Sequence, residues 1–549
     1  MIRPPFRTPS PLPAALNLHE LWGWLGLGLV LGLGGIIGRA QPARSLAPFP
    51  QFTLTVNSAQ DGEIQPDDQL TLREAIALAN GTLPRTALSP AEAAQVQDRS
   101  SGSRIVFDLP PQHTTIRLQT LLPAIAAPDL VIDGTTQGGY EPGNPVVSLQ
   151  PQAGVEVLRG LTLTADRLQV RGLHLSGFRA LHRQSFALPS ASILVTHHPQ
   201  AESLGGPWRA EDRPGPQHIV IADNVIGPAT PGGDALGAAF GIWIYEARHL
   251  TIANNQLQNH RGSAIVTSHW ATDTRIEKNQ IRGNGARGMP DAVRLEGQIG
   301  GTQILGNQLL ENAGSAVFLF KTSGAIAVQD NRILGNGTEI PRAALYLMGN
   351  DHQIRQNYIG DQNGPGVVIA AYPQSRRNII VDNQFRNLKG LSIDLVTRRH
   401  TTVRDYQVGD GPNPRTESTK RHLDTANRGI SAPEFLSREF SVVGGGVSLE
   451  GVAMPGATVS LYRVQQDESS SVFQQRGPLS QRVAQTTVDQ TGRFDFFLSE
   501  AELGAQLSDQ LSDQASAQFS VIATHPDYGT SEPARNVTVR SRGVSRNPE

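Results

Sequence analysis

The residues of this 549-residue chain that could do chemistry lie near its middle. Arg294 and Glu296 are the polar residues of a segment in which apolar and polar residues alternate, and Lys321 follows one repeat later. A basic side chain can remove a proton while a nearby cation or acid neutralises a substrate carboxylate, which is the chemistry of β-elimination. These three are therefore candidate catalytic residues. The alternative is an exposed ion pair, which contributes little energetically.

Aromatic residues accompany these charges. In a strand, successive side chains point to opposite faces, so the alternation assigns an outward face to each of several apolar segments. The aromatic residues that this assignment places outward are Trp243, Tyr245, Phe318, Phe320 and Tyr346. Flat aromatic faces with a few charged groups suit the binding of sugar rings, so these five are candidate glycan-binding residues. The alternative is that loops or the C-terminal region cover them, because an exposed apolar patch is costly unless it is used.

A third polar group lies beyond residue 396. Asp405, Asp410 and Asp424 follow one another in an irregular segment that also carries Asn413 and Asn427. Calcium takes several oxygen ligands from such loops, so the three aspartates are a candidate Ca²⁺ site. Their spacing is not that of an EF-hand, and the alternative is a plain polar linker.

The composition excludes other kinds of site. The chain has no cysteine, which excludes disulfides, thiolate metal sites and a cysteine nucleophile. Lys and Arg together number 47 against 49 Asp and Glu, for a net charge of -2. Nucleic acid is therefore not expected as a partner, because phosphate binding needs a basic field.

The candidate residues belong to a repeat marked by asparagine. The repeated asparagines each stand two residues before an apolar residue: Asn224, Asn255, Asn279, Asn307, Asn331, Asn357 and Asn383. A drifting period in the twenties is typical of a solenoid coil. Stacked at one corner, the amides can bond from coil to coil, which predicts a structural Asn ladder.

Each repeat divides into three short strands separated by turns. Residues 241–245, 248–252 and 255–258 show the division, and the same pattern recurs through the later repeats. A helical period fits none of them. The sequence therefore predicts a parallel β-helix over residues 101–396, with apolar residues pointing inward and coils spaced by about 4.8 Å.

The N-terminus has the order of an export signal. Basic residues precede the uncharged apolar run 21–37, and small residues follow it. We expect residues 1–40 to be a signal peptide, cleaved after Ala40, or else a membrane anchor through residues 21–37. In both cases the rest of the chain is secreted, periplasmic or on the cell surface.

A helical cap precedes the repeat. Residues 50–100 are predicted to form this cap, with a helix over residues 72–80. Thr71 and Glu74 make a capping box, in which each side chain satisfies a free backbone donor of the first turn. The stretch LTLREAIALANG resembles the CSLREAI element at the head of many exported parallel β-helix proteins, with Leu70 and Thr71 at its Cys and Ser positions.

Two further regions carry this resemblance. Residues 105–140 are similar to the same proteins, and residues 393–395, 409–411 and 424–427 resemble their Asp-rich connection. The coils resemble the PbH1 repeats of pectate lyases and related polysaccharide enzymes. The resemblance implies a right-handed parallel β-helix whose binding groove follows the outward face of the first strand of each coil.

A different pattern closes the chain. After a linker at residues 397–429, residues 430–541 alternate as short strands between Pro-Gly and Thr-Gly turns, which predicts an immunoglobulin-like β-sandwich. Lines such as AMPGATVSLY and VDQTGRFDF resemble bacterial surface Ig-like modules. The fold class is therefore all-β: a capped parallel β-helix followed by a sandwich.

Two functions fit this organisation. The first is a non-catalytic exported protein, whose β-helix binds a cell-surface glycan or serves as a structural or adhesive surface, and which we expect to be a monomer. The second is a lyase or hydrolase that acts on an acidic polysaccharide through Arg294, Glu296 and Lys321. The same fold hosts both, so the geometry of these three groups has to decide between them.

Overall fold

The structure is a computed structural model. It describes residues 49–179, 190–197, 215–228, 239–372, 374–397, 407–415, 423–465, 475–507 and 516–540. The predicted signal or anchor in residues 1–40 and the aspartate Asp405 lie outside these ranges. Within them, no helix has both the length and the apolar character that crossing a membrane requires.

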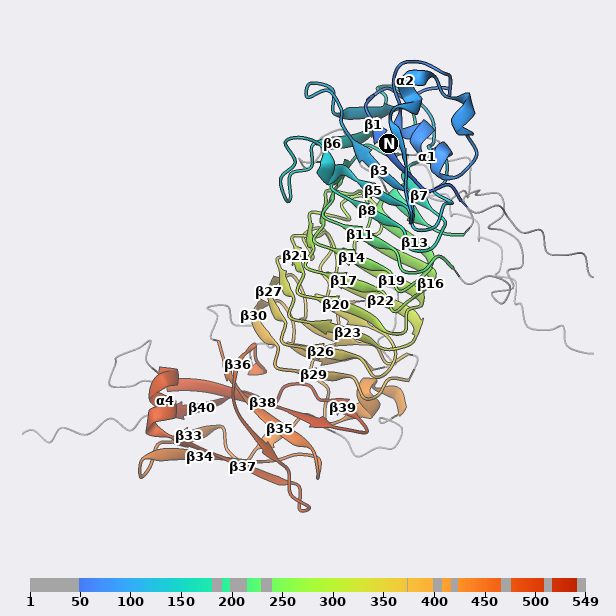
Figure 1. Cartoon of the computed structure of the whole chain (residues 1–549). Coiled ribbons are helices and arrows are strands. Elements are labelled where there is room, and N and C mark those ends of the chain that lie inside the picture. Colours follow the sequence, from blue (N-terminus) through green and yellow to red (C-terminus); the bar gives the residue numbers. More distant parts are fainter. Residues whose placement is uncertain are drawn as a thin grey trace, which may run out of the picture. The chain divides into compact units, whose positions relative to one another are not determined.

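The chain winds through three long sheets and adds a strand to each of them as it advances through its coils (Figure 1). Sheet I, whose strands are the second in each coil, contains β2 (Val96–Asp98), β1 (Phe52–Val56), β3 (Arg104–Phe107), β5 (Val131–Asp133), β8 (Gln169–Arg171), β11 (Val220–Ala222), β14 (Thr251–Ala253), β17 (Arg275–Glu277), β20 (Thr302–Leu305), β23 (Ile326–Gln329), β26 (Gln353–Arg355) and β29 (Ile379–Val381).

The other two sheets complete each coil. Sheet II, formed by the first strands, contains β7 (Arg159–Leu163), β10 (Ala191–Val195), β13 (Phe240–Arg248), β16 (Ile265–Thr272), β19 (Val293–Gln298), β22 (Val317–Ser323), β25 (Leu345–Leu347), β28 (Val367–Ile369) and β31 (Ile393–Leu395). Sheet III, formed by the third strands, contains β4 (Thr115–Leu118), β6 (Val147–Pro151), β9 (Leu173–Leu175), β12 (Val225–Ile226), β15 (Gln256–Gln258), β18 (Gln280–Arg282), β21 (Gln308–Leu310), β24 (Arg332–Leu334), β27 (Tyr358–Gln362) and β30 (Gln384–Leu388).

The register shows why these short strands are stable. Ile242 of β13 lies beside Ile265 of β16, which lies beside Val293 of β19 and then Val317 of β22. All four are fully buried in the core inside the coils. Because each coil places an apolar residue directly over its equivalent, short strands bury enough surface together that none needs to be stable alone.

The predicted Asn positions lie in one buried column beside sheet III. The Nδ2 of Asn224 donates to the Oδ1 of Asn255 at 3.0 Å, and the same bond recurs at 2.9–3.0 Å down to Asn383. Each Oδ1 also accepts the backbone N–H of the preceding Asn. These bonds satisfy the amide groups and backbone N–H groups of the column, and burying those groups without hydrogen bonds would be costly.

A second amide column, which the sequence analysis missed, follows the sheet III strands of the central coils. Asn284 donates to Asn312 at 3.0 Å, Asn312 donates to Asn336 at 2.8 Å, and the imidazole of His260 contacts Asn284 at 2.8 Å. Burial lowers the pKa of His260 to about 4, so it is neutral. The available signal was a second Asn, five residues after the first, in each of these coils.

A small cap covers the first coils. The helix α1 (Leu72–Ala79) begins at Thr71, whose side chain accepts from Glu74 while Glu74 accepts from the Thr71 backbone. The cap also contains η1 (Arg85–Ala87) and α2 (Pro90–Ala93), and β2 runs antiparallel to β1. The one-turn helix η2 (Gly134–Thr136) follows β5.

The C-terminal region is built of two further sheets. One has the order β32 (Glu434–Phe435), β34 (Gly446–Val452) and β37 (Arg493–Ser499). The other has the order β33 (Glu439–Ser441), β40 (Val537–Arg540), β38 (Ser516–His525), β35 (Thr458–Val464) and β36 (Leu479–Thr487), with β39 (Gly529–Thr530) beside β38. Helix α4 (Glu500–Leu507) follows β37.

Hydrogen bonds join this sandwich to the last coils. The N–H of Ile380 in β29 donates to Thr530 Oγ1 at 2.9 Å, and the N–H of Asp382 donates to the Tyr462 hydroxyl at 3.0 Å. Burial raises the pKa of Tyr462 to about 12. Asn427, in η5 (Ala426–Gly429), bonds both Asn378 and the Thr530 carbonyl.

The fold class predicted from the sequence is therefore confirmed in its main part. The chain is nearly all β, with long parallel sheets, a small helical cap and a C-terminal pair of sheets. The immunoglobulin-like character of that pair, and the domain boundaries, stay predictions.

Candidate functional site on the outward face of sheet II

The predicted site residues lie in two rows across the outward face of sheet II. The first row follows the strand register, in which Arg294 of β19 lies beside Phe318 of β22, and Phe318 lies beside Tyr346 of β25. On the other side of Arg294 come Val266 of β16 and then Trp243 of β13. The alternation therefore placed these side chains on the outer side of the β-helix wall.

The aromatic residues of this first row are buried, which corresponds to the second of the two alternatives that the sequence left open for them. Trp243 is 6% exposed, Phe318 3% and Tyr346 5%. The indole N–H of Trp243 donates to Ser268 Oγ at 2.7 Å, and the ring of Phe318 stacks on Tyr346 with 5.5 Å between centroids. These outward aromatic rings pack on one another because stacking removes apolar surface from water.

The second row remains accessible. Tyr245, His269, Glu296 and Phe320 are half-buried, and Glu296 lies beside Phe320 in the register. The rings of Tyr245 and His269 are 6.0 Å apart, and burial raises the pKa of Tyr245. The sequence analysis named Tyr245, Glu296 and Phe320 as candidates, whereas His269 was not among them. We call these four residues the outer row.

Arg294 is the centre of a charged network rather than a free cation. Its Nε donates to Glu296 Oε1 at 2.6 Å and its Nη1 to Asp291 Oδ2 at 3.1 Å. The guanidinium also lies over the Phe318 ring, 4.4 Å from the centroid. Two carboxylates and one aromatic face therefore hold this arginine, whose side chain is only 17% exposed.

The network extends two coils further than the sequence suggested. Asp291 is fully buried and accepts from Arg342 Nη1 at 3.2 Å and from the backbone N–H of Ser315 at 3.1 Å. Burial raises the pKa of Asp291, although Arg342 and Arg294 both act to lower it. Arg342 lies 51 residues from Asp291, and no sequence signal connects them.

The convergence of the three catalytic candidates on one open point stays a prediction. Arg294 and Glu296 are bonded to each other, and the side chain of Lys321 lies outside what the structure describes. A base that removes a proton from a substrate has to reach that proton with a free lone pair. Arg294, held by two carboxylates, offers none.

Of the three linker aspartates, the structure gives hydrogen-bond partners for Asp410. Asp410 Oδ2 accepts from the backbone and the hydroxyl of Thr397 at 2.9 and 2.8 Å, and Asp424 is half-buried. In the part of the chain that the structure describes, no three His, Cys, Asp or Glu side chains gather as a metal site. Because Asp405 is outside that part, calcium at this linker stays a prediction.

Asp410 instead lies in an acidic cluster at the end of the β-helix. Its N–H donates to Asp394 of β31, and Glu532 of the sandwich accepts from Leu395 at 3.2 Å and from Asn413 at 2.7 Å. Burial raises the pKa of Glu532 to about 7, and burial together with Glu532 and Asp410 raises the pKa of Asp394. The segments around 393–395 and 409–411, singled out in the sequence by resemblance, meet here.

Comparison with known proteins adds a family likeness over part of the chain. Residues 241–403 match the model of a family described as periplasmic copper-binding protein (NosD). The match covers less than a third of the chain and spans the coils from β13 to β31, which contribute strands to all three sheets. No curated protein matches the chain.

The described residues do not fit a copper site in this segment. His260 and His352 are buried and bonded to Asn284 and to the Met348 carbonyl, and burial lowers the pKa of each to about 4. Neither His249 nor His269 belongs to a group of three ligating side chains among the residues described. Among the described residues, the part that resembles NosD consists of coils of the β-helix.

Solved structures with some likeness are also β-helix proteins. Tailspike protein 2 of bacteriophage CBA120 matches at 10% identity and a TM-score of 0.36, over 81% of this chain and 72% of that chain. The surface adhesin PfbA of Streptococcus pneumoniae matches at 13% and 0.34, over 53% and 86%. The periplasmic alginate epimerase AlgG matches at 10% and 0.33, over 62% and 83%. With TM-scores below 0.5, these likenesses carry no argument about the site.

Proposed function

We propose that this chain is an exported, periplasmic or cell-surface β-helix protein that binds a glycan through the outer row without cleaving it. The ring of Tyr245 lies near the imidazole of His269, and the carboxylate of Glu296 lies beside Phe320, so the row offers both apolar faces and hydrogen-bonding groups to a sugar. The buried aromatic residues of the first row hold the outer row in place.

One observation carries the non-catalytic part of the proposal. The charge of Arg294 is engaged by Glu296 and Asp291, and Asp291 is in turn held by Arg342. A lyase needs a free base and a cation that faces the substrate carboxylate. The network is satisfied within the wall of the β-helix, so a structural role accounts for it more fully than catalysis does.

The remaining parts of the chain support an exported surface protein. Residues 1–40 have the order of a signal, and the family that residues 241–403 resemble is described as periplasmic. The two C-terminal sheets have orders that correspond to strands A-B-E and A′-G-F-C-C′ of immunoglobulin-like sandwiches. We propose that this module presents the β-helix on its surface.

A glycan array probed with residues 41–549 tests the proposal. We expect binding to at least one polysaccharide and no rise in ultraviolet absorbance from unsaturated products. Tyr245→Ala should weaken that binding roughly three- to tenfold, because an aromatic face contributes about 0.5–1.5 kcal/mol beyond its buried area. A reducing-end assay on the same polysaccharides should show no hydrolysis.

Phe497→Ala is the matched control, because Phe497 is an aromatic residue of the sandwich that is 65% exposed. It should leave binding unchanged. Absorbance that rises with the wild-type chain and disappears in Arg294→Ala would establish a lyase and overturn the proposal. An array without any binding would overturn the glycan assignment.

A further inference from the structure

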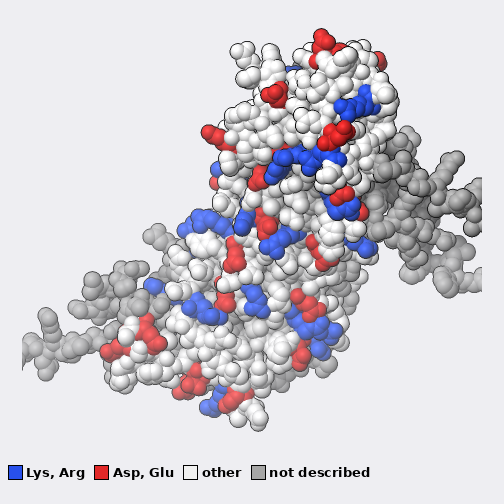
Figure 2. All heavy atoms as spheres, in the orientation of Figure 1, with Lys and Arg blue, Asp and Glu red and all other residues white. Residues whose placement is uncertain are grey.

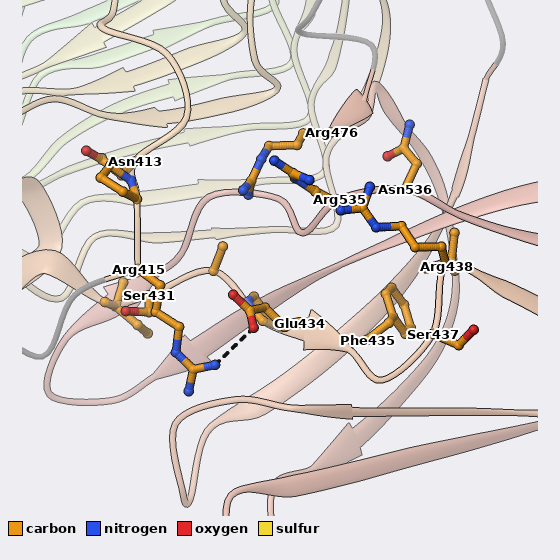
Figure 3. Close-up of a pocket in the computed structure, with 15 residues that line it drawn as sticks. Asn413, Arg415, Ser431, Glu434, Phe435, Ser437, Arg438, Arg476, Arg535 and Asn536 are labelled. Carbon is orange, nitrogen blue, oxygen red and sulfur yellow. Dashed lines mark hydrogen bonds and ion pairs between the residues drawn. The ribbon is translucent and has the colours of Figure 1, made fainter.

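A pocket in the C-terminal region gathers arginines from segments far apart in the sequence. Its volume is about 400 Å³, and Arg438, Arg476 and Arg535 line it together with Arg415 (Figure 3). Arg438 precedes β33, Arg476 precedes β36 and Arg535 precedes β40. The folding of the sandwich, rather than any local basic run, therefore concentrates this positive charge.

Three of these arginines have no carboxylate bonded to them in the part of the chain that the structure describes. Arg415 forms an ion pair with Glu434 at 3.1 Å, drawn as a dashed line in Figure 3. Arg476 instead donates to the carbonyl of Pro533 at 2.9 Å. Burial lowers the pKa of Arg476, and Arg535 and Arg438 act in the same direction, so these positive charges repel one another.

Two carboxylates act against this positive charge without cancelling it. Glu434 is already paired with Arg415, and Glu532 is bonded to Leu395 and Asn413. Both carboxylates act to raise the pKa of Arg476, which favours its charged form. Arg438 and Arg535 are exposed at the rim and face solvent. An anion that enters the pocket would therefore meet two accessible guanidinium groups, with a third behind them.

The pocket also has an apolar wall. The ring of Phe435 is half-buried and is fixed from behind by Phe440 and Phe494, at 6.1 and 6.0 Å between centroids. Ile430 and Val537 complete this wall. A ring face next to arginines suits a ligand that has a C–H-rich face and an acidic group on the same small unit.

We propose that this pocket binds an acidic saccharide unit, whose carboxylate, phosphate or sulfate is held by Arg438 and Arg535 and whose ring packs on Phe435. Guanidinium groups match such anions through two parallel hydrogen bonds. The volume lies within the range of small-ligand pockets, which is about 300–1,000 Å³. The pocket shares no residue with the outer row, so this site goes beyond the glycan binding proposed for sheet II.

Calorimetric titration of the full exported chain with trigalacturonic acid tests this site, with uncharged galactotriose and inorganic phosphate as comparison ligands. We expect trigalacturonic acid to bind and galactotriose not to bind. Arg438→Gln and Arg535→Gln should each weaken binding about tenfold, which corresponds to about 1.4 kcal/mol. Phosphate should compete, and added salt should weaken the binding because it screens the charges.

Arg493→Gln is the matched control. Arg493 is an exposed arginine of the same sandwich that does not line the pocket, so it removes the same charge elsewhere. Arg438 and Arg535 are also exposed, so all three variants should retain the thermal midpoint of the wild type. Binding should be unchanged in the control.

Several results would overturn the proposal. These are the absence of binding by trigalacturonic acid, equal binding of galactotriose, or an equal loss in Arg493→Gln. Phosphate that binds while the acidic sugar does not would overturn the saccharide assignment. The test is distinct from that of the outer row, because Tyr245→Ala should leave this titration unchanged.

Discussion

The coils of the β-helix and the sandwich at its end arrange charge in opposite ways. In the coils, acidic and basic side chains pair from one coil to the next, as in Asp129 with Arg167 and Asp361 with Arg386. On the face seen in Figure 2, both signs are interspersed. Where the last coil meets the sandwich, Asp394 of β31 and Glu532 lie together, and the arginines of the pocket lie together in the C-terminal region.

The difference follows from the geometry of stacking. Parallel coils place each residue directly beside its equivalent, so a carboxylate easily finds an arginine above or below it. Asp133 is fully buried, yet Arg171 and Arg104 outweigh the effect of burial and hold its pKa at about 2. Glu532, equally buried but bonded to neutral donors near other acids, has a pKa of about 7. Paired charge stabilises the coils, whereas segregated charge leaves arginines available to a ligand.

Asp291→Ala is expected to have the largest effect on this comparison. It removes the acceptor between Arg294 and Arg342 and leaves both cations with low exposure. The free energy of unfolding should fall by about 3–5 kcal/mol, measured by denaturant titration. Asp291→Asn keeps the shape of the side chain but not its charge, so its free energy of unfolding should lie between those of Asp291→Ala and the wild type. A loss below about 1 kcal/mol would show that coil pairing does not stabilise the wall.

The acids that lie together near the sandwich, Glu532 and Asp394, should make the folded chain less stable as pH rises. The pKa of Glu532 is about 7 in the folded chain against 4.5 ordinarily, so the folded state binds more protons between these values. The free energy of unfolding should therefore decrease as pH rises from 4.5 to about 7, and Asp394 adds to this decrease. Asp133 acts in reverse, because the stability that it contributes is lost as pH falls from 3.8 towards 2.

Denaturant titrations across this pH range, on the wild type and on Glu532→Gln, check the prediction. The variant should show a flatter profile between pH 4.5 and 7, whatever its stability at one pH. Identical slopes in the two proteins would mean that Glu532 titrates normally and that the charges at the sandwich are not segregated as described.

The smallest effect is expected for a pair on the surface of the coils. Arg282 and Glu311 are 2.7 Å apart, and both side chains are 56% exposed. Glu311→Ala should change the free energy of unfolding by less than about 1 kcal/mol, because solvent and salt screen such pairs. A loss of stability as large as that of Asp291→Ala would show that the strength of these ion pairs does not depend on their burial.

Much of the fold was predictable from local pattern. The three-strand repeat, the capping box at Thr71 and the asparagine spacing each follow from periodicities that the sequence displays directly. The asparagines that precede an apolar residue by two positions are those whose amides are linked in the structure, from Asn224 to Asn383. Stacking makes local pattern informative, because neighbours in space are equivalents in the repeat.

The site was less predictable. Alternation placed Trp243, Phe318 and Tyr346 on the outward face, but it could not show that they are buried there. It also could not find Arg342, which reaches Asp291 across two coils. Solvent exposure and ion pairing depend on what lies over a face, and periodicity contains no information about that.

The sequence by itself determined the coils, their cap and the columns of stacked residues, because each coil repeats one local pattern and bonds only to its neighbours. The tertiary structure alone decided which outward side chains are accessible, which acids gather at Glu532 and which arginines meet at the pocket. The acids near Glu532 and the arginines of the pocket come from segments that are distant in the sequence and meet only when the sandwich folds and bonds to the last coils.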